Sequence, residues 1–180
     1  MSDREAGSGH EEGFRPFVLE DDGTFPNSRL PVLIYTAVRL PSPDLAGGFE
    51  RLFQSNGWGG TWRDGIYDFH HYHSTAHEVL GIAGGTAVVQ LGGPSGVTLE
   101  VRAGQCLILP AGTAHKRIRS SRQLLVVGAY PAGQEPDLCR GVPADRPAAD
   151  RRIAGVPLPA RDPVLADRGL GGLWRSIAGR

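Results

Sequence analysis

Frequent turn residues and a series of short apolar runs predict an all-β fold, a sandwich or a barrel, for this chain of 180 residues. Glycine and proline account for 26 and 14 residues, and glycine is well above its usual share of roughly 7%. Between residues 66 and 130 the strand-like runs follow one another at the short, regular spacing of all-β domains. The runs are IYDFHHYH, EVLGIA, TAVVQL, GVTLEVR, QCLILP, AHKRIR and QLLVVGAY.

The run at 96–102 has the clearest two-residue period, which is typical of a strand with one buried face. Val97, Leu99 and Val101 lie on one face, and polar or charged residues alternate with them on the other. A further strand, PVLIYTAV, is predicted at residues 31–38.

One helix is predicted to begin at Pro43, because Ser42 can cap it and proline suits the first helical position. Its apolar residues form one face at spacings of four, three and one: Leu45, Phe49, Leu52 and Phe53. The pair Asn56-Gly57 is expected to end the helix, before a glycine-rich loop.

The two ends of the chain differ from this central part. Residues 1–13 are polar and lack apolar periodicity, so a flexible N-terminus is expected. Residues 132–180 are rich in proline, arginine, aspartate and alanine, which favours an extended C-terminal tail that packs on the domain or is partly disordered. Its possible anchors are Leu158, Val164, Leu165 and Trp174. A single domain is therefore expected at residues 14–131.

Charge and cysteine content exclude several classes of protein. Nineteen basic residues balance nineteen acidic ones, so binding to nucleic acid or to a membrane surface is not expected. Cys106 and Cys139 are too few for a disulfide scaffold or a four-cysteine zinc site, and they favour a reduced, cytoplasmic setting. The first residues lack the apolar core of a signal peptide, and no apolar stretch approaches the roughly 20 residues of a membrane helix.

Five of the six histidines lie between residues 70 and 115. His71 and His73 are two residues apart, so within a strand their side chains share a face. Strict alternation would place His77 on that face. The turn-like residues 74–76 reset the phase, however, so that Glu78 can reach the pair from the next strand.

His115 follows a rigid turn at residues 110–112, and a sheet that closes on itself can bring it to the same point. Three neutral imidazoles and one carboxylate suit a borderline divalent metal ion, namely Mn, Fe, Co, Ni or Zn. His70 and His77 are expected either at the surface or as hydrogen-bond partners of a ligand histidine's second nitrogen.

These residues carry a resemblance to the cupin superfamily of RmlC-like proteins. Residues 65–85 resemble cupin motif 1, with Gly65, His71, His73, Glu78 and Gly85 at its spacing. Residues 104–119 resemble motif 2, with Gly104, Pro110, Ala111, Gly112 and His115, but Arg119 stands where the motif usually has asparagine. The runs HHYHSTAHEVLG and VVGAYP further resemble the small, single-domain YjlB-type bacterial cupins.

The resemblance implies a cupin double-stranded β-helix, a jelly-roll barrel, with a metal ion inside. It implies that the ligands are His71, His73, Glu78 and His115. It does not imply a reaction, because cupins include oxygenases, isomerases, decarboxylases, hydrolases and noncatalytic binders.

Four further residues are candidates for substrate binding. Tyr67 and Phe69 share the strand parity of His71, so either can line a pocket. Arg117 and Arg119 face inward with His115 if their strand has no bulge, whereas a bulge or strand end would turn them to solvent. An inward arginine would need a carboxylate from the protein or an anionic group of a ligand.

Two functional hypotheses follow. One is a metal-dependent enzyme, an oxygenase, isomerase or decarboxylase, that acts on a small polar or anionic metabolite. The other is a noncatalytic metal-dependent module that binds or senses a small molecule; a metal-free barrel is a third reading. Open sheet edges invite pairing, so a homodimer is also expected, through residues 14–40 or the segment after residue 131.

Overall fold

The computed structural model describes residues 14–178. The expected flexible N-terminus, residues 1–13, lies outside the described residues. Within the described range, nine strands form two antiparallel sheets, accompanied by three α-helices and one short 3-10 helix. The six-stranded sheet has the order β1 (Phe14–Leu19), β2 (Ser28–Tyr35), β7 (Cys106–Leu109), β4 (Glu78–Gly84), β9 (Leu125–Pro131), β3 (Trp58–Asp64). The three-stranded sheet has the order β6 (Val97–Arg102), β5 (Thr86–Leu91), β8 (His115–Ser120).

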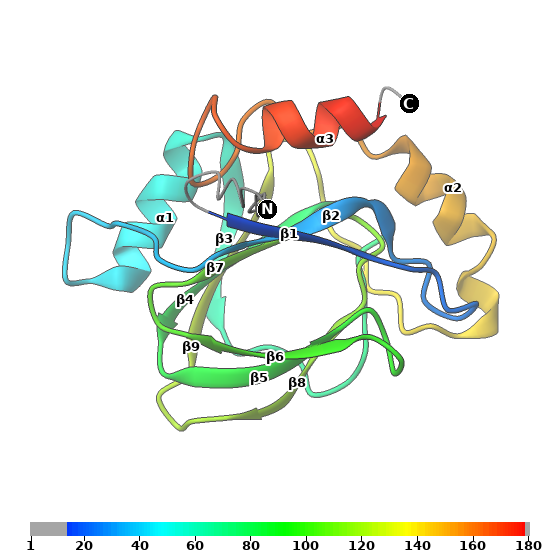
Figure 1. Ribbon diagram of the computed structural model, residues 1–180, viewed down its shortest axis with the longest axis horizontal. Helices are drawn as coiled ribbons and strands as arrows, with labels where there is room; N and C mark the ends of the chain where they lie inside the picture. The colour runs from blue at the N-terminus through cyan, green and yellow to red at the C-terminus, as the bar shows by residue number, and fades with distance from the viewer. Residues whose placement is uncertain (1–13, 179–180) are drawn as a thin grey trace, which may run out of the picture.

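The two sheets face each other, and two of the helices cover the other face of the larger sheet (Figure 1). One apolar core fills the space between the sheets, and a second lies beneath α1 (Leu45–Ser55) and α3 (Leu170–Ala178). The jelly-roll barrel that the sequence predicts is not closed, because among the described residues no continuous ladder joins the two sheets. The arrangement is an open sandwich, which is consistent with a jelly roll.

Strand β4 shows how both faces of the larger sheet become buried. Leu80 and Ile82 belong to the core between the sheets, whereas Val79 points into the core beneath the helices. Glu78 has the parity of Leu80 and therefore points between the sheets. Burial on both faces explains why this strand is a continuous apolar run rather than an alternating one.

Gly81 allows helix α1 to approach strand β4 closely. A Cβ atom added at this position would lie 2.6 Å from Cγ of Phe49. We expect Gly81→Ala to lower the free energy of unfolding by about 1–3 kcal/mol, because the ring or the helix must shift. Urea unfolding measures this loss. Gly59→Ala is the matched control, since a Cβ there meets nothing within 4 Å; equal midpoints for both variants would contradict the prediction.

Two local predictions are wrong at the start of the fold. The helix begins at Leu45 rather than Pro43, because the side chain of Asp44, and not Ser42, accepts a hydrogen bond from the backbone N of Gly47 at 3.1 Å. The glycine-rich segment after residue 57 is strand β3 rather than a loop, because it pairs with β9.

The predicted strand at residues 66–73 is also wrong. Only two isolated bridges occur there, between His71 and His115 and between Tyr72 and Cys139. Successive residues thus pair with different segments of the chain, so no continuous ladder forms.

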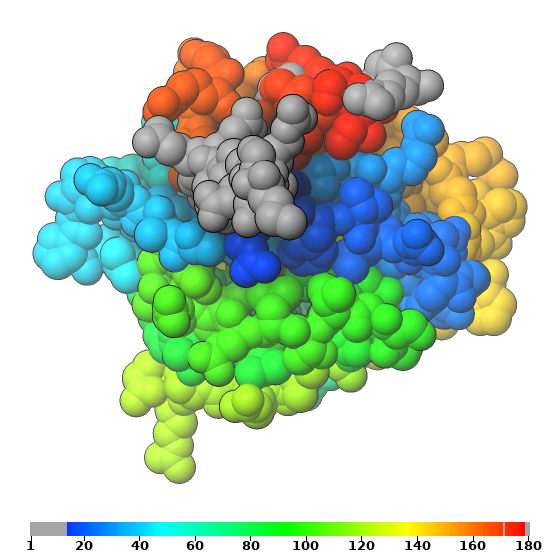
Figure 2. All heavy atoms as spheres, in the orientation of Figure 1, coloured from blue at the N-terminus to red at the C-terminus, as the bar shows by residue number. Residues whose placement is uncertain are grey.

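The C-terminal segment is partly helical rather than simply extended. The prediction that the fold has one helix, near the N-terminus, is therefore wrong. It contains a 3-10 helix (Pro143–Asp145), α2 (Ala148–Gly155) and α3. Leu170 and Trp174 of α3 are buried against the larger sheet, and their i, i+4 spacing gives the helix one apolar face. In Figure 2 the later part of this segment, in orange and red, lies at the top of the molecule. No helix within residues 14–178 is long and apolar enough to cross a membrane.

Candidate metal centre

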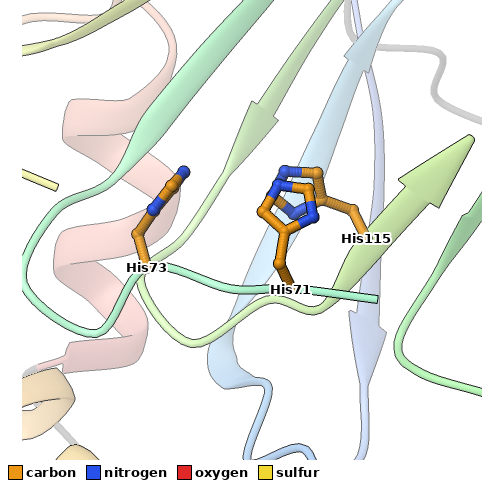
Figure 3. A group of neighbouring side chains, drawn as sticks. All are labelled: His71, His73 and His115. Atoms are coloured by element: carbon orange, nitrogen blue, oxygen red, sulfur yellow. The ribbon is translucent and has the colours of Figure 1, made fainter. Parts of the chain in front are cut away.

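Three histidines meet at the inner side of the sandwich (Figure 3). His71 and His73 come from the irregular segment before β4, and His115 is the first residue of β8. One ring nitrogen of each lies within 4.8 Å of the others. His71 and His115 are both 3% exposed, so two of the three rings are screened from bulk water.

Backbone carbonyls fix the protonation of all three rings. Each ring bonds a carbonyl oxygen through Nδ1: His71 that of Phe69 at 3.1 Å, His115 that of Thr113 at 3.0 Å, and His73 that of Asp137. A carbonyl can only accept, so each Nδ1 carries a proton and Nε2 is the nitrogen that faces the cluster. The Nε2 lone pairs are therefore left for a metal ion, as in protein metal sites generally.

Glu78 completes the cluster from the first position of β4. Its Oε2 atom lies 3.4 Å from Nε2 of His73 and 3.3 Å from Nε2 of His115. This buried oxygen has no hydrogen-bond partner among the described residues. A buried carboxylate that faces imidazole nitrogens at this distance is stabilised by positive charge, which a divalent cation would supply, so the four side chains fit such an ion.

The electrostatics of the cluster favour an anionic carboxylate. Burial, and then the neighbouring His115, lowers the pKa of His71 to about 3, so this ring is neutral. Burial acts to lower the pKa of His73, but the Glu78 carboxylate outweighs it and the pKa is raised. Burial acts to raise the pKa of Glu78, but His73 and His115 outweigh it and the pKa is lowered.

A cavity of about 750 Å³ opens onto the cluster. Tyr67 lines it and is 56% exposed. Phe69 does not line the cavity. It stacks behind Tyr67, with ring centroids 4.8 Å apart, and the guanidinium of Arg140 covers its ring at 3.6 Å. Of the two aromatic candidates, Tyr67 is therefore the one that can touch a ligand.

The two arginine candidates separate because the register of β8 against β5 shifts at Ile118. Arg117 lines the cavity, whereas Arg119 is exposed and does not. Arg117 donates from Nε to the carbonyl of Ile66 at 3.0 Å and from a terminal nitrogen to Oγ of Ser120 at 3.3 Å. Both acceptors are neutral, so the guanidinium is oriented while its charge stays available to a ligand.

His70 and His77 do not hydrogen-bond to the clustered histidines. The ring of His77 packs on Trp174 at 4.9 Å, and its Nδ1 accepts from the backbone N of Ala111 at 2.9 Å. The ring of His70 packs against Phe25 at 5.4 Å. The expectation that either is the partner of a ligand histidine is wrong, because backbone carbonyls already fill that role.

Three residues near the cluster are missing from the sequence-based candidates: Trp62, Tyr130 and Asp137, all of which line the cavity. Tyr130 accepts a hydrogen bond from Nε1 of Trp62 at 2.9 Å. Burial and the Glu78 carboxylate raise its pKa, so the phenol keeps its proton. The strand run QLLVVGAY, which ends in Tyr130, offered a signal for this residue; Asp137 had none.

A buried histidine cluster between two antiparallel sheets is the arrangement that the cupin resemblance implies, and the fold and site thus define a candidate metal-binding cupin. No family model matches the chain. The chain belongs to the family of YjlB, a protein of Bacillus subtilis (strain 168) described as uncharacterized. The two are 36% identical over 159 residues, which cover 88% of this chain and 94% of YjlB.

Solved structures show weaker similarity. The epimerase RmlC of Legionella pneumophila is 12% identical with a TM-score of 0.40, over 66% of this chain and 72% of that one. An acireductone dioxygenase of Bacillus anthracis, with cadmium in its active centre, is 14% identical with a TM-score of 0.38, over 52% and 64% of the two chains. Similarity at this level says nothing about the chemistry of this chain.

Proposed function

We propose that the chain is a metal-binding cupin that holds one divalent transition metal ion and acts on a small polar or anionic metabolite. The proposed ligands are His71, His73, His115 and Glu78. The observation that carries the proposal is the unpartnered, buried Oε2 atom of Glu78, which faces imidazole nitrogens at 3.3 and 3.4 Å.

In such a site the metal ion and the protein side chains have different roles. A bound divalent ion would polarise a substrate oxygen or acidify a bound water. The chain's own contribution is to bind and orient: Arg117 presents an uncompensated charge, and Tyr130 holds a neutral hydroxyl close to Glu78. The apolar core between the sheets lowers the local dielectric, which strengthens both contacts.

The noncatalytic alternative also has support. Of the cavity-wall side chains outside the proposed ligand set, Tyr130 has a raised pKa and keeps its proton near neutral pH, and the carboxylate of Asp137 already accepts hydrogen bonds from Ser74, so neither is free to act as a base. A cavity that binds a metabolite on a metal ion without converting it would need no such group.

One experiment tests the proposal and separates the two alternatives. Untagged protein is analysed for its metal content, and the metal-loaded protein is incubated with a metabolite extract. Depletion of a compound supports an enzyme, whereas retention of an unchanged compound supports a binding module. Protein that takes up no Mn, Fe, Co, Ni or Zn after loading contradicts the proposal in both forms.

Arg117 is expected to anchor the anionic part of a ligand. We predict that Arg117→Met weakens binding of oxalate to the metal-loaded protein by about 10-fold or more, because a charge-assisted hydrogen bond is lost. Isothermal titration calorimetry measures the change. Arg119→Met is the matched control, since Arg119 is on the same strand but outside the cavity. Equal oxalate affinities for wild type and Arg117→Met would refute the anion role.

A further inference from the structure

The three histidines differ in what holds them. The Nδ1 atoms of His71 and His115 donate to carbonyls two residues earlier in the chain, so neighbouring residues set the orientation of these two rings. The Nδ1 atom of His73 instead bonds the carbonyl of Asp137, which is 64 residues away along the chain and outside both cupin-like motifs. The position of Asp137 therefore bears directly on one proposed ligand.

Asp137 is fastened to the segment around His73 through all its polar groups. Oδ1 accepts from the backbone N of Ser74 at 2.6 Å, and Oδ2 accepts from the hydroxyl of Ser74. The backbone N of Asp137 donates to Oγ1 of Thr75 at 3.0 Å. Since His73 has no continuous strand ladder around it, these contacts take the place of one.

Arg152 of α2 closes the same arrangement from outside. Its Nε donates to Oγ of Ser74 at 2.6 Å and lies 3.4 Å from Oδ2 of Asp137. Burial acts to raise the pKa of Asp137, but the hydrogen bonds from Ser74 outweigh it. The net pKa is lowered, which keeps the carboxylate ionised. Charged and neutral donors thus hold one carboxylate in a fixed orientation.

We infer that the carboxylate of Asp137 is a positioning group, which fixes the carbonyl that orients His73 and thereby sets the affinity of the metal site. The inference rests on the proposed metal function. It assigns a role in the site to the C-terminal segment, which supplies the partner of His73, the carboxylate and the arginine. Removing the carboxylate leaves the backbone carbonyl of residue 137 in the chain. It removes the two hydrogen bonds from Ser74 that hold this residue in place.

The experiment compares Asp137→Ala and Asp137→Asn with wild type. We expect Asp137→Ala to weaken Co²⁺ binding by about 10- to 100-fold, as loss of a ligand's supporting partner typically does. Asp137→Asn keeps an oxygen for the backbone N of Ser74 and should recover part of this loss. The visible absorption of bound Co²⁺ should change in Asp137→Ala, because His73 approaches the ion differently.

Asp145→Ala is the matched control. Asp145 also binds backbone N atoms of the C-terminal segment, at Gly141 and Val142 (2.9 and 3.0 Å), and has no contact with His73. Its Co²⁺ affinity should equal that of wild type. If Asp137→Ala does not fold, Arg152→Met replaces it, since that side chain is 40% exposed; we expect a smaller loss in the same direction.

A readout on the metal-free protein separates this inference from the proposed function. The ¹⁵N-detected signal of the His73 Nδ1–H should lose its protection from solvent exchange in Asp137→Ala. Wild type that binds no Co²⁺ contradicts the proposed function, and the exchange measurement still tests whether Asp137 orients His73. A folded Asp137→Ala protein with wild-type affinity and an unchanged His73 signal would overturn the inference.

Discussion

Replacing His71 and His73 together by alanine is expected to abolish metal binding. Wild-type protein loaded with Zn²⁺ or Co²⁺ should retain about one ion per chain after dialysis, and the double variant should retain less than roughly a tenth of that amount. The reason is that two of the four proposed ligands are lost, and one imidazole with one carboxylate rarely holds a transition metal ion. Elemental analysis of dialysed protein measures the content.

The control for this experiment is His70→Ala. His70 adjoins the pair in sequence, but its ring packs on Phe25 and does not line the cavity. Its metal content should equal that of wild type, and circular dichroism should show that all variants are folded. Undiminished metal in the double variant would remove the assignment of these two histidines as ligands.

The grouping of His71, His73 and Glu78 was predictable from local spacing, whereas His115 was assigned through the resemblance to the second cupin motif. His71 and His73 keep the two-residue alternation even without a regular strand, and both rings reach the cluster. The turn-like residues before Glu78 shift its phase, so that its carboxylate and not the ring of His77 points toward His73. Each of these inferences needed only a few neighbouring residues.

Secondary structure that depends on distant partners was not predictable. Strand β3 contains glycines that disfavour a strand, but Trp62 packs where a Cβ added at Gly128 would lie 2.0 Å from its Cε2 atom. The segment at 66–73 has strong strand propensity, yet its backbone pairs with two different segments. In both cases tertiary contacts override the local preference.

Two features of the site also depend on information that the sequence does not display. The outward position of Arg119 results from a register shift at Ile118, and register is set by pairing across the sheet. Asp137 reaches His73 through its backbone carbonyl, a group that every residue has. No residue type could mark that position in advance.

The packing of Trp174, in helix α3, against the larger sheet should contribute strongly to stability. Trp174 is 1% exposed, and its Nε1 donates to the carbonyl of Pro31 at 3.0 Å. Nearby, the buried carboxylate of Asp162 accepts hydrogen bonds from the hydroxyl of Tyr35 and from the backbone N of Leu170, the first residue of α3. Helix α3 is therefore held to the larger sheet by an apolar contact and by buried hydrogen bonds.

We predict that Trp174→Ala lowers the free energy of unfolding by about 3–5 kcal/mol, because a large buried ring and its hydrogen bond are lost together. Urea unfolding gives the value, and limited proteolysis should show faster cleavage near α3. Arg175→Ala, an exposed neighbour on the same helix, should change the free energy by less than about 0.5 kcal/mol. If Trp174→Ala unfolds at the wild-type urea concentration, the C-terminal helix does not stabilise the sandwich, and its packing against β2 contributes nothing to the fold.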